Sequence, residues 1–167
     1  MPEAISDSST LINLAIIGHL SLLRYFHEKI IVPPAVWREV VIEGRKKPGA
    51  KEVEAAREVG WLEVISPGNR SLVELLKQNL DDGEAETIVL ALERNPGIVL
   101  LDESDARQMA EVYNLPKTGV IGILIRAKLD GKISSLKKEI DQLRDEAGFW
   151  ISKELYKRVL HQVGEFF

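Results

Sequence analysis

The sequence predicts an α/β fold built around a mainly parallel sheet. Short apolar runs alternate with longer segments of helical periodicity, which is the pattern of strands flanked by helices. Residues 98–101 show it most clearly, because four consecutive apolar side chains are typical of a strand buried on both faces. Neither an internal repeat nor a linker-like tract interrupts this alternation.

The composition suits a compact globular protein. The chain has 167 residues, the length of a single domain spanning 1–167, with 45% hydrophobic and 29% charged residues. No segment approaches the roughly 18 uninterrupted apolar residues of a membrane span, and the start of the chain lacks the features of a signal peptide. We therefore expect one cytoplasmic domain that makes no contact with a membrane.

Carboxylates and hydroxyls must carry any chemistry. The chain has no cysteine, which excludes disulfides, thiolate nucleophiles and cysteine-rich zinc sites. Its histidines, His19, His27 and His161, lie far apart and have no metal-ligand spacing. A net charge of −4 argues against a protein that binds nucleic acid over its whole surface, although a local basic patch is compatible with it.

The first half of the chain alternates strands and helices. Proline suits a first helical turn and glycine the position after a last one, so Pro34 can begin a helix that Gly44 ends. The predicted elements are strand 4–6, helices 9–17 and 20–27 interrupted at Gly18, strand 29–33, helix 34–44, an exposed helix within 45–60 after a basic turn, and strand 61–66.

The second half continues the alternation and becomes mostly helical. Its predicted elements are helices 72–78 and 81–97, the buried strand 97–102, helices 103–114, 119–129 and 134–147, an edge strand at 149–152, and a last helix over 153–167. The aliphatic stretch 119–125 and the segment 149–160 could supply a dimer face, or they could pack in the core.

Two aspartates occupy equivalent places in this pattern. Asp7 directly follows the first strand, and Asp102 directly follows the strand at 97–102. Since the carboxyl ends of parallel strands form the crevice where ligands bind, both acids should face that crevice. Each could instead cap the helix that follows it, a common use of aspartate. Asp105, three residues after Asp102, would lie on the same face if the helix has begun.

A second acidic group opens the helix at 81–97. Asp81 followed by Glu84 fits a capping box, which explains one or two of the acids in "DDGEAE". Glu84 and Glu86 point about 200° apart on a helix, so only one of them can face a given site. Glu84 lies near the edge of the buried stripe. Glu39 borders the buried face of its own helix and could equally be a solvated residue.

Carboxylates that converge on one crevice repel one another unless a cation lies between them. Magnesium or manganese fits best, because both prefer oxygen ligands and the chain offers no soft ligand. Such ions activate water and stabilise the charge that develops on a phosphate during hydrolysis. The sequence therefore favours metal-assisted hydrolysis at the crevice.

The motifs together resemble the PIN-domain family. "ISDSSTLINLA" is similar to its opening motif, a strand that ends in Asp7 with the hydroxyl of Ser9 two positions later. "VPPAVWREVV" resembles the second motif, whose helix carries Glu39, and "GEAETIVLALE" the third, with Glu84 where many members have Asp. "GIVLLDESDARQMA" resembles the fourth, a strand that ends in Asp102. The resemblance covers essentially the whole chain, and "TGVIGILIRAK" and "GFWISKELYKRVL" fit an uncharacterised PIN-like branch with a GEAE motif.

This resemblance implies a three-layer fold with a sheet of about four to five strands. It also implies a VapC-like, metal-dependent endoribonuclease, the toxin of a toxin–antitoxin pair, with an RNA substrate, an antitoxin partner and a homodimeric state. The implied catalytic residues are Asp7, Glu39, Glu84 and Asp102, of which Asp7, Glu84 and Asp102 would hold Mg²⁺ or Mn²⁺. Ser9 and Asp105 would support them, with Asp82 and Glu86 as further candidates.

Other interpretations of the sequence stay open. One is an inactive PIN-like module that binds RNA or a protein through the same crevice. A phosphotransfer domain ranks last, because a phosphatase of that kind needs a second aspartate where this chain has Ser9. Basic residues at 45–47 with Arg126, Lys128 and Lys132 could contact RNA, or they could be solvated charges and helix ends. No row of aromatic residues predicts base stacking.

Overall fold

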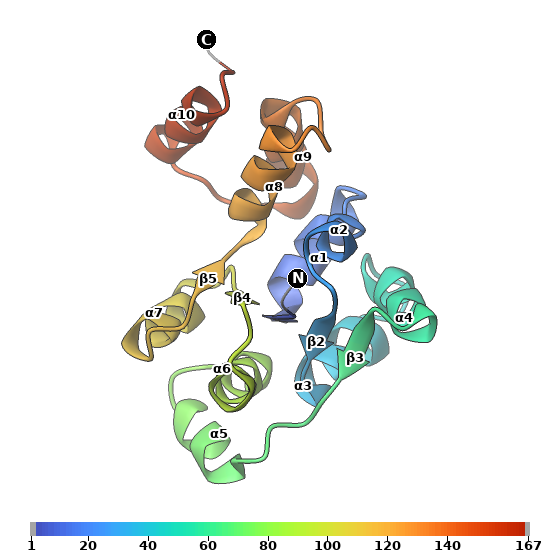
Figure 1. Cartoon of the computed structure of the whole chain (residues 1–167), viewed down its shortest axis with the longest axis vertical. Coiled ribbons are helices and arrows are strands. Elements are labelled where there is room, and N and C mark those ends of the chain that lie inside the picture. The colour runs from blue at the N-terminus through green and yellow to red at the C-terminus, as the bar shows by residue number, and fades with distance from the viewer. Residues whose placement is uncertain (1–2, 166–167) are drawn as a thin grey trace.

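A computed structural model describes residues 3–165, and its centre is one parallel sheet with the strand order β3-β2-β1-β4-β5 (Figure 1). Every pair of neighbouring strands is parallel. This confirms the predicted α/β class. The strands are β1 (Ala4–Ser6), β2 (Ile30–Val32), β3 (Leu62–Val64), β4 (Ile98–Leu100) and β5 (Lys117–Thr118).

Helices connect the strands and form the C-terminal third of the chain. Those before β4 are α1 (Ser8–Ile16), α2 (Leu22–Phe26), α3 (Pro34–Trp37), the π-helical segment η1 (Arg38–Glu43), α4 (Ala50–Val59), α5 (Arg70–Leu76) and α6 (Asp82–Arg94). Those after β4 are α7 (Ser104–Val112), α8 (Val120–Leu129), α9 (Leu136–Ala147) and α10 (Lys153–Gln162). No helix of residues 3–165 combines the length and apolar character that crossing a bilayer requires.

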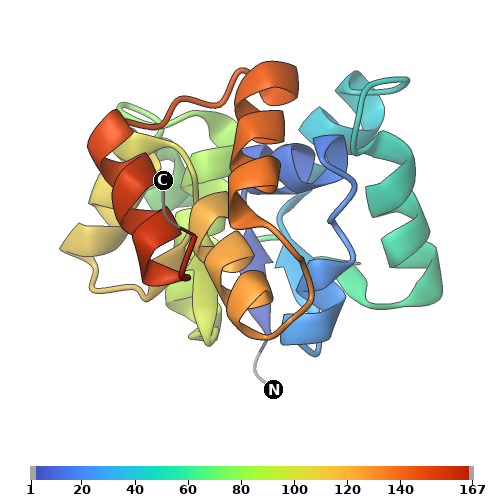
Figure 2. The ribbon, with the colours of Figure 1, turned by 90° about the horizontal axis from the view of Figure 1, so that it is seen from above.

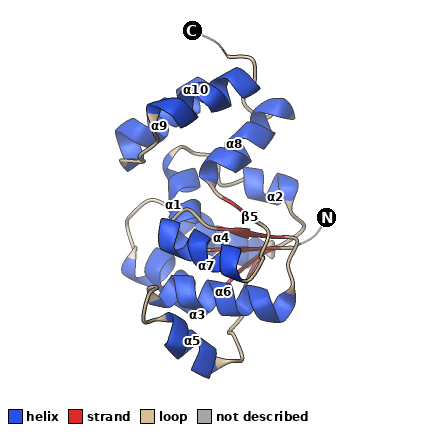
Figure 3. Cartoon of the chain, turned by 90° about the vertical axis from the view of Figure 1, so that its left-hand side faces the viewer, coloured by secondary structure: helices blue, strands red, loops and turns tan. Residues whose placement is uncertain are grey.

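The sheet is the middle of three layers, with helices on both of its faces (Figure 3). Its side chains alternate between two separate apolar cores. In β1, Ala4 packs with the helices of one face and Ile5 with those of the other. Ile30 and Ile31 repeat this alternation in β2. The first core includes residues of α1, α2, α4, α8, α9 and α10, and the second includes residues of α5, α6 and α7. Strands buried on both faces explain the continuous apolar runs in the sequence.

The order in which strands are added to the sheet changes side between β1 and β4. From β1 the chain moves outward through β2 to β3, and it then returns to the other side of β1 for β4 and β5. In such a sheet, ligands bind outside the carboxyl ends of the strands at this switch point. Figure 2 shows the connection between α9 and α10 passing over the edge of the sheet opposite the N-terminus. The topology thus identifies the ends of β1 and β4 as the place to look for a site.

The helix predicted over 34–44 has an irregular second half. It begins at Pro34, continues as η1, and ends at Gly44. A Cβ at Gly44 would overlap the backbone of the preceding turn, which explains why glycine stands there. A π-helical turn changes the direction in which side chains project, and such turns occur frequently at functional sites. This one carries Glu39.

Two sequence predictions about the C-terminal third are corrected, and one strand there was not predicted. The residues 149–152 form no strand but an irregular connection, in which Phe149 packs against the core while Trp150 is exposed. The fifth strand is instead β5, whose two residues are too few and too polar to predict. The last helix ends at Gln162, and residues 166–167 of that prediction lie outside the described range. Val120, Ile123 and Leu124 are buried, so core packing was the right alternative for these side chains.

Candidate active site

Asp7 is held at the carboxyl end of β1 by two backbone hydrogen bonds. One carboxylate oxygen accepts the N–H of Thr10 at 2.9 Å, so Asp7 caps α1 as the sequence allowed. The other accepts the N–H of Asp102 at 3.2 Å, from the end of the neighbouring strand. The side chain is nearly inaccessible, with 2% of its surface exposed. Capping therefore accounts for only one of its two oxygens.

Asp102 lies beside Asp7, and hydrogen bonds from two segments, α1 and the start of α8, orient its carboxylate. The hydroxyl of Thr10 donates to it at 2.8 Å, and the N–H of Val120, in the first turn of α8, donates at 3.1 Å. The prediction that Asp102 could cap the following helix is wrong, because its carboxylate lies at the start of α8 rather than of α7. A Cβ at Gly119 would overlap the Asp102 carboxylate, so glycine is required there.

Burial makes both aspartates unusually weak acids. It raises the pKa of Asp7 to about 7, and the nearby charge of Asp102 contributes to this increase while the bond from Thr10 opposes it. Burial likewise raises the pKa of Asp102, against the hydrogen bonds from Thr10 and Val120 and the charge of Arg107. Two adjacent carboxylates in a poorly hydrated site favour a bound cation, which would stabilise their charged forms.

Glu84 contributes a further acid from the first turn of α6. Its carboxylate accepts the N–H of Asp81, and Asp81 accepts the N–H of Glu84, which confirms the capping box. Burial raises the pKa of Glu84, and the charges of Asp81, Glu103 and Asp105 add to the effect. Glu84 therefore belongs to an acidic group that includes the start of α7.

Glu39 reaches the same region from η1. It accepts a hydrogen bond from the hydroxyl of Ser8, the residue after Asp7, at 2.9 Å. A Cβ on Gly83 would lie 3.6 Å from its carboxylate, so Glu39 also lies close to the first turn of α6 beside Glu84. The structure thus brings Glu39 of η1 close to Ser8, just after the end of β1, and to Gly83, in the first turn of α6.

The two supporting candidates have different surroundings. The hydroxyl of Ser9 donates to Glu103 at 2.9 Å, which links the first turn of α1 to the start of α7. Asp105 is exposed in the first turn of α7, and its charge acts on Glu84. Both residues therefore lie at the acidic edge of the site rather than between the two aspartates.

The structure gives the two further candidates, Glu86 and Asp82, other partners. Glu86 is buried on the opposite side of α6, where it accepts the N–H of Ala35 at 3.0 Å and pairs with Arg70 at 3.2 Å. Asp82 pairs with Lys77 at 3.2 Å. This confirms the prediction that Glu84 and Glu86 point to different sides of the helix.

Sequence reasoning missed several residues that shape the site. Thr10 binds both aspartates, Ser8 binds Glu39, and Gly119 leaves room for Asp102. Arg107 donates to the carbonyl of Leu101 at 2.8 Å. The run of hydroxyls after Asp7 was the available signal for Ser8 and Thr10, whereas nothing local indicated the other two.

The basic residues that the sequence offered for RNA have other contacts. Arg126 lies over the ring of Phe26 at 4.3 Å, and Lys132 over that of Tyr25 at 3.8 Å. Lys128 donates to the carbonyl of Ser134. These three therefore stabilise the end of α8, while residues 45–47 are exposed.

Oxygen donors dominate the site, which suits a hard divalent cation. Within residues 3–165, no three His, Asp or Glu side chains lie close enough to hold one ion together, so the expectation that Asp7, Glu84 and Asp102 all ligate one metal ion directly is wrong. Magnesium is commonly held by one or two carboxylates, with water and substrate phosphate completing its coordination. The pair formed by Asp7 and Asp102 meets that requirement.

Fold and site together define a class of protein: a parallel α/β protein with a buried acidic crevice at the switch point of its sheet. The chain belongs to the PIN-domain family, since the family DUF3368, described as a PIN domain, matches residues 3–165. This confirms the resemblance found in the motifs. PIN domains are commonly nucleases and generally use divalent metals, so the fold is of a nuclease type. No curated protein matches the chain.

Proposed function

We propose that the protein is a divalent-metal-dependent endoribonuclease that hydrolyses phosphodiester bonds in RNA. The observation that carries the proposal is a pair of desolvated carboxylates, Asp7 and Asp102, at the switch point of a parallel sheet, where the backbone N–H of Asp102 donates to the Asp7 carboxylate at 3.2 Å. The commonness of nuclease activity among PIN domains supports it.

Asp7 and Asp102 would hold Mg²⁺ or Mn²⁺, and Glu84 would contribute through water. When bound, the ion supplies activation of water and stabilisation of the charge that develops on the phosphate. Thr10 orients both aspartates through its N–H and its hydroxyl. These contacts fix the carboxylates before substrate arrives, which reduces the cost of organising the site.

Glu39 would orient the attacking water or accept its proton. The hydroxyl of Ser8 holds the Glu39 carboxylate in place. Ser9 would support the phosphate, and Asp105 would add negative charge at the edge of the site. Arg107, beside Asp102, would help to balance the negative charge of the phosphate.

As part of the same proposal, the protein acts in the cytoplasm as a toxin that an antitoxin protein restrains, and it pairs as a homodimer. The resemblance of the motifs to toxin-type PIN ribonucleases is the support for these partners.

A noncatalytic RNA- or protein-binding module is the second candidate. It is favoured by the capping box, because the carboxylate of Glu84 already accepts the N–H of Asp81 at 3.1 Å. In such a module the acids would serve the fold, and binding of a divalent metal would be weak.

Cleavage of end-labelled single-stranded RNA, structured RNA and single-stranded DNA, with Mg²⁺ or Mn²⁺, tests the proposal. Asp102→Asn should lose activity, whereas Asp145→Asn, a matched change on the exposed face of α9, should retain it. EDTA should abolish cleavage. Equal activity in wild type and Asp102→Asn would refute the proposal. Inactivity of both, together with no heat of Mn²⁺ binding in calorimetry, would favour the module.

A further inference from the structure

Two clefts meet at Asp102, one on each side of it. The first, of about 370 Å³, is lined by Ser9, Asn13, Glu103, Phe149 and Trp150 together with Asp102. The second, of about 490 Å³, includes Arg107, Lys117 and Arg158 as well as Asp102 and Phe149. Because Asp102 and Phe149 line both, the clefts adjoin and form one path past Asp102.

Trp150 gives the first cleft an aromatic surface. It lies in the irregular connection between α9 and α10, and 81% of its surface is exposed. Its neighbour Phe149 packs against the core and anchors the connection, while Gly148 turns the chain with a φ of 66°. Exposure of so large an apolar side chain is unfavourable in water, and an aromatic face beside a cleft is typical of ligand binding.

The other residues of the first cleft suit a nucleobase better than a phosphate. Glu103 lines this cleft and not the second, and its negative charge would repel a phosphate. Asn13 offers an amide, whose N–H and carbonyl groups can donate to and accept from the edge of a base. A base stacked on Trp150 would lie within reach of such groups.

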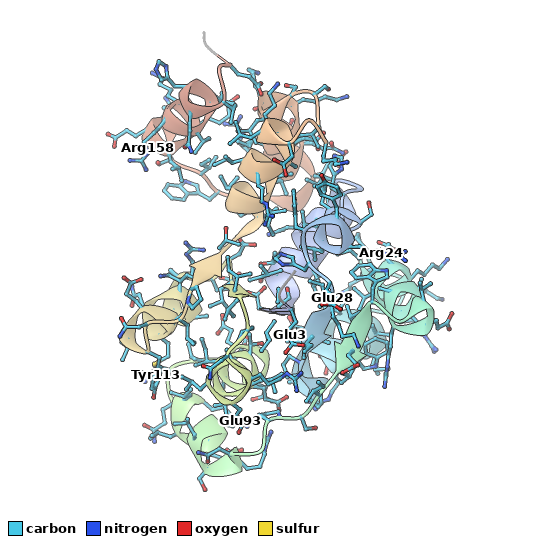
Figure 4. The ribbon with its side chains drawn as sticks, viewed as in Figure 1. Glu3, Arg24, Glu28, Glu93, Tyr113 and Arg158 are labelled. Carbon is cyan, nitrogen blue, oxygen red and sulfur yellow. The ribbon has the colours of Figure 1, made fainter. Side chains whose placement is uncertain are left out.

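The second cleft has the opposite charge. Arg158 projects from α10, on the same side of the molecule as α7 with Tyr113 (Figure 4). Arg158 is exposed and forms no ion pair with the acidic residues of the described range. Arg107 projects from α7, and Lys117 of β5, which pairs with Glu111, lies at the same cleft. Three cations from separate elements provide a surface for a phosphate backbone.

We propose that single-stranded RNA crosses the site along this path, with one base stacked on Trp150 and the phosphates beyond the scissile bond held by Arg158 and Lys117. The proposal rests on the proposed function and deepens it by naming the residues that would bind the RNA on either side of Asp102. A stacked base must be free of its partner strand, so a duplex does not fit. Trp150 is then a specificity-determining residue and Arg158 a substrate-binding residue.

Binding of a fluorescent single-stranded RNA octamer to the Asp102→Asn protein with Mg²⁺, followed by anisotropy, tests this without cleavage. Adding Trp150→Ala should weaken binding by about tenfold or more, the usual effect of losing one stacked base. Trp150→Phe should retain most of the affinity. Leu129→Ala, at a 63% exposed apolar residue that lines neither cleft, should have no effect.

The charged side of the path is tested with a neighbouring pair on α10. Arg158→Gln should reduce the slope of log affinity against log salt by about 0.7, the effect of one lost phosphate contact with a single strand. Lys157→Gln makes the same change of charge outside the cleft and should leave the slope unchanged. An equal effect of the two variants would show that Arg158 acts only through net charge and would overturn its role.

The two proposals fail in different ways. Unchanged affinity in Trp150→Ala, or equal competition by duplex and single-stranded RNA, would overturn the stacking site even if wild type cleaves RNA. Loss of affinity in Trp150→Ala without any cleavage by wild type would support the binding path and refute the ribonuclease.

Discussion

The carboxylate of Asp7 accepts the backbone N–H of Asp102 at 3.2 Å, across a separation of 95 residues in the chain. The bond joins the ends of β1 and β4, where Ser6 is level with Leu100 in the sheet. It means that the position of each acid depends on the other strand. A substitution at either aspartate should therefore also alter the position of the other.

Stability should depend on pH through Asp7. Its pKa is about 7 in the folded protein, against an ordinary value of 3.8, so between about pH 4 and pH 7 the folded chain binds more protons than the unfolded one. The free energy of unfolding then falls as pH rises through this window, by up to a few kcal/mol. We therefore expect thermal unfolding in EDTA to show a smaller loss of stability between about pH 4 and pH 7 for Asp7→Asn than for wild type.

A divalent metal should reverse this loss. Raising the pH favours the charged forms of both carboxylates, so Mn²⁺ should raise the melting temperature more at pH 8 than at pH 5. Asp7→Asn should respond less at both values. Identical melting curves with and without Mn²⁺ at pH 8 would contradict a cation site at this pair.

Thr10 should control the protonation of Asp102. Its hydroxyl donates to the carboxylate at 2.8 Å and lowers a pKa that burial raises. Thr10→Val keeps the backbone N–H but loses the hydroxyl, so the pKa of Asp102 should rise and the acidic limb of the pH–rate profile should move to higher pH. We expect a loss of activity of about 10- to 100-fold near neutral pH.

Thr10→Ser is the matched variant, because it retains the hydroxyl. Its profile should stay close to that of wild type. If Thr10→Val and Thr10→Ser lost activity equally with unshifted profiles, packing rather than the hydrogen bond would be responsible.

Gly119 should be intolerant of a side chain. A Cβ there would overlap the carboxylate of Asp102 and lie 3.1 Å from the carbonyl of Leu101. We expect Gly119→Ala to displace Asp102, abolish cleavage and destabilise the fold by about 1–3 kcal/mol. Gly68→Ala, whose Cβ would meet only the side chain of Glu93 at 3.4 Å, is the control in the same denaturation and cleavage assays. Full activity in Gly119→Ala would contradict the importance of this contact.

Substitutions at Glu84 and Glu86 should have different effects: loss of activity at Glu84 and loss of stability at Glu86. Glu84→Gln can keep the capping box, because glutamine also serves at that position, so it should fold normally and lose cleavage. Glu86 is 5% exposed and accepts the N–H of Ala35, so Glu86→Ala should destabilise the protein by about 1–3 kcal/mol. Urea denaturation and RNA cleavage on both variants would check the distinction, and an active Glu84→Gln would remove Glu84 from the proposed machinery.

The sequence by itself determined the class of fold and the place of the main acids. Strands buried on both faces require continuous apolar runs, and parallel strands end at a common edge, so Asp7 and Asp102 could be placed there from local patterns. Helical geometry likewise separated Glu84 from Glu86.

Only the tertiary structure decided what surrounds those acids. The contact between Thr10 and Asp102 joins residues 92 positions apart, and the place of Trp150 depends on how the connection between α9 and α10 packs through Phe149. The requirement for glycine at position 119 likewise arises only because the start of α8 lies beside Asp102, after the end of β4. Such contacts follow from the packing of whole elements, which short-range periodicity and spacing do not encode.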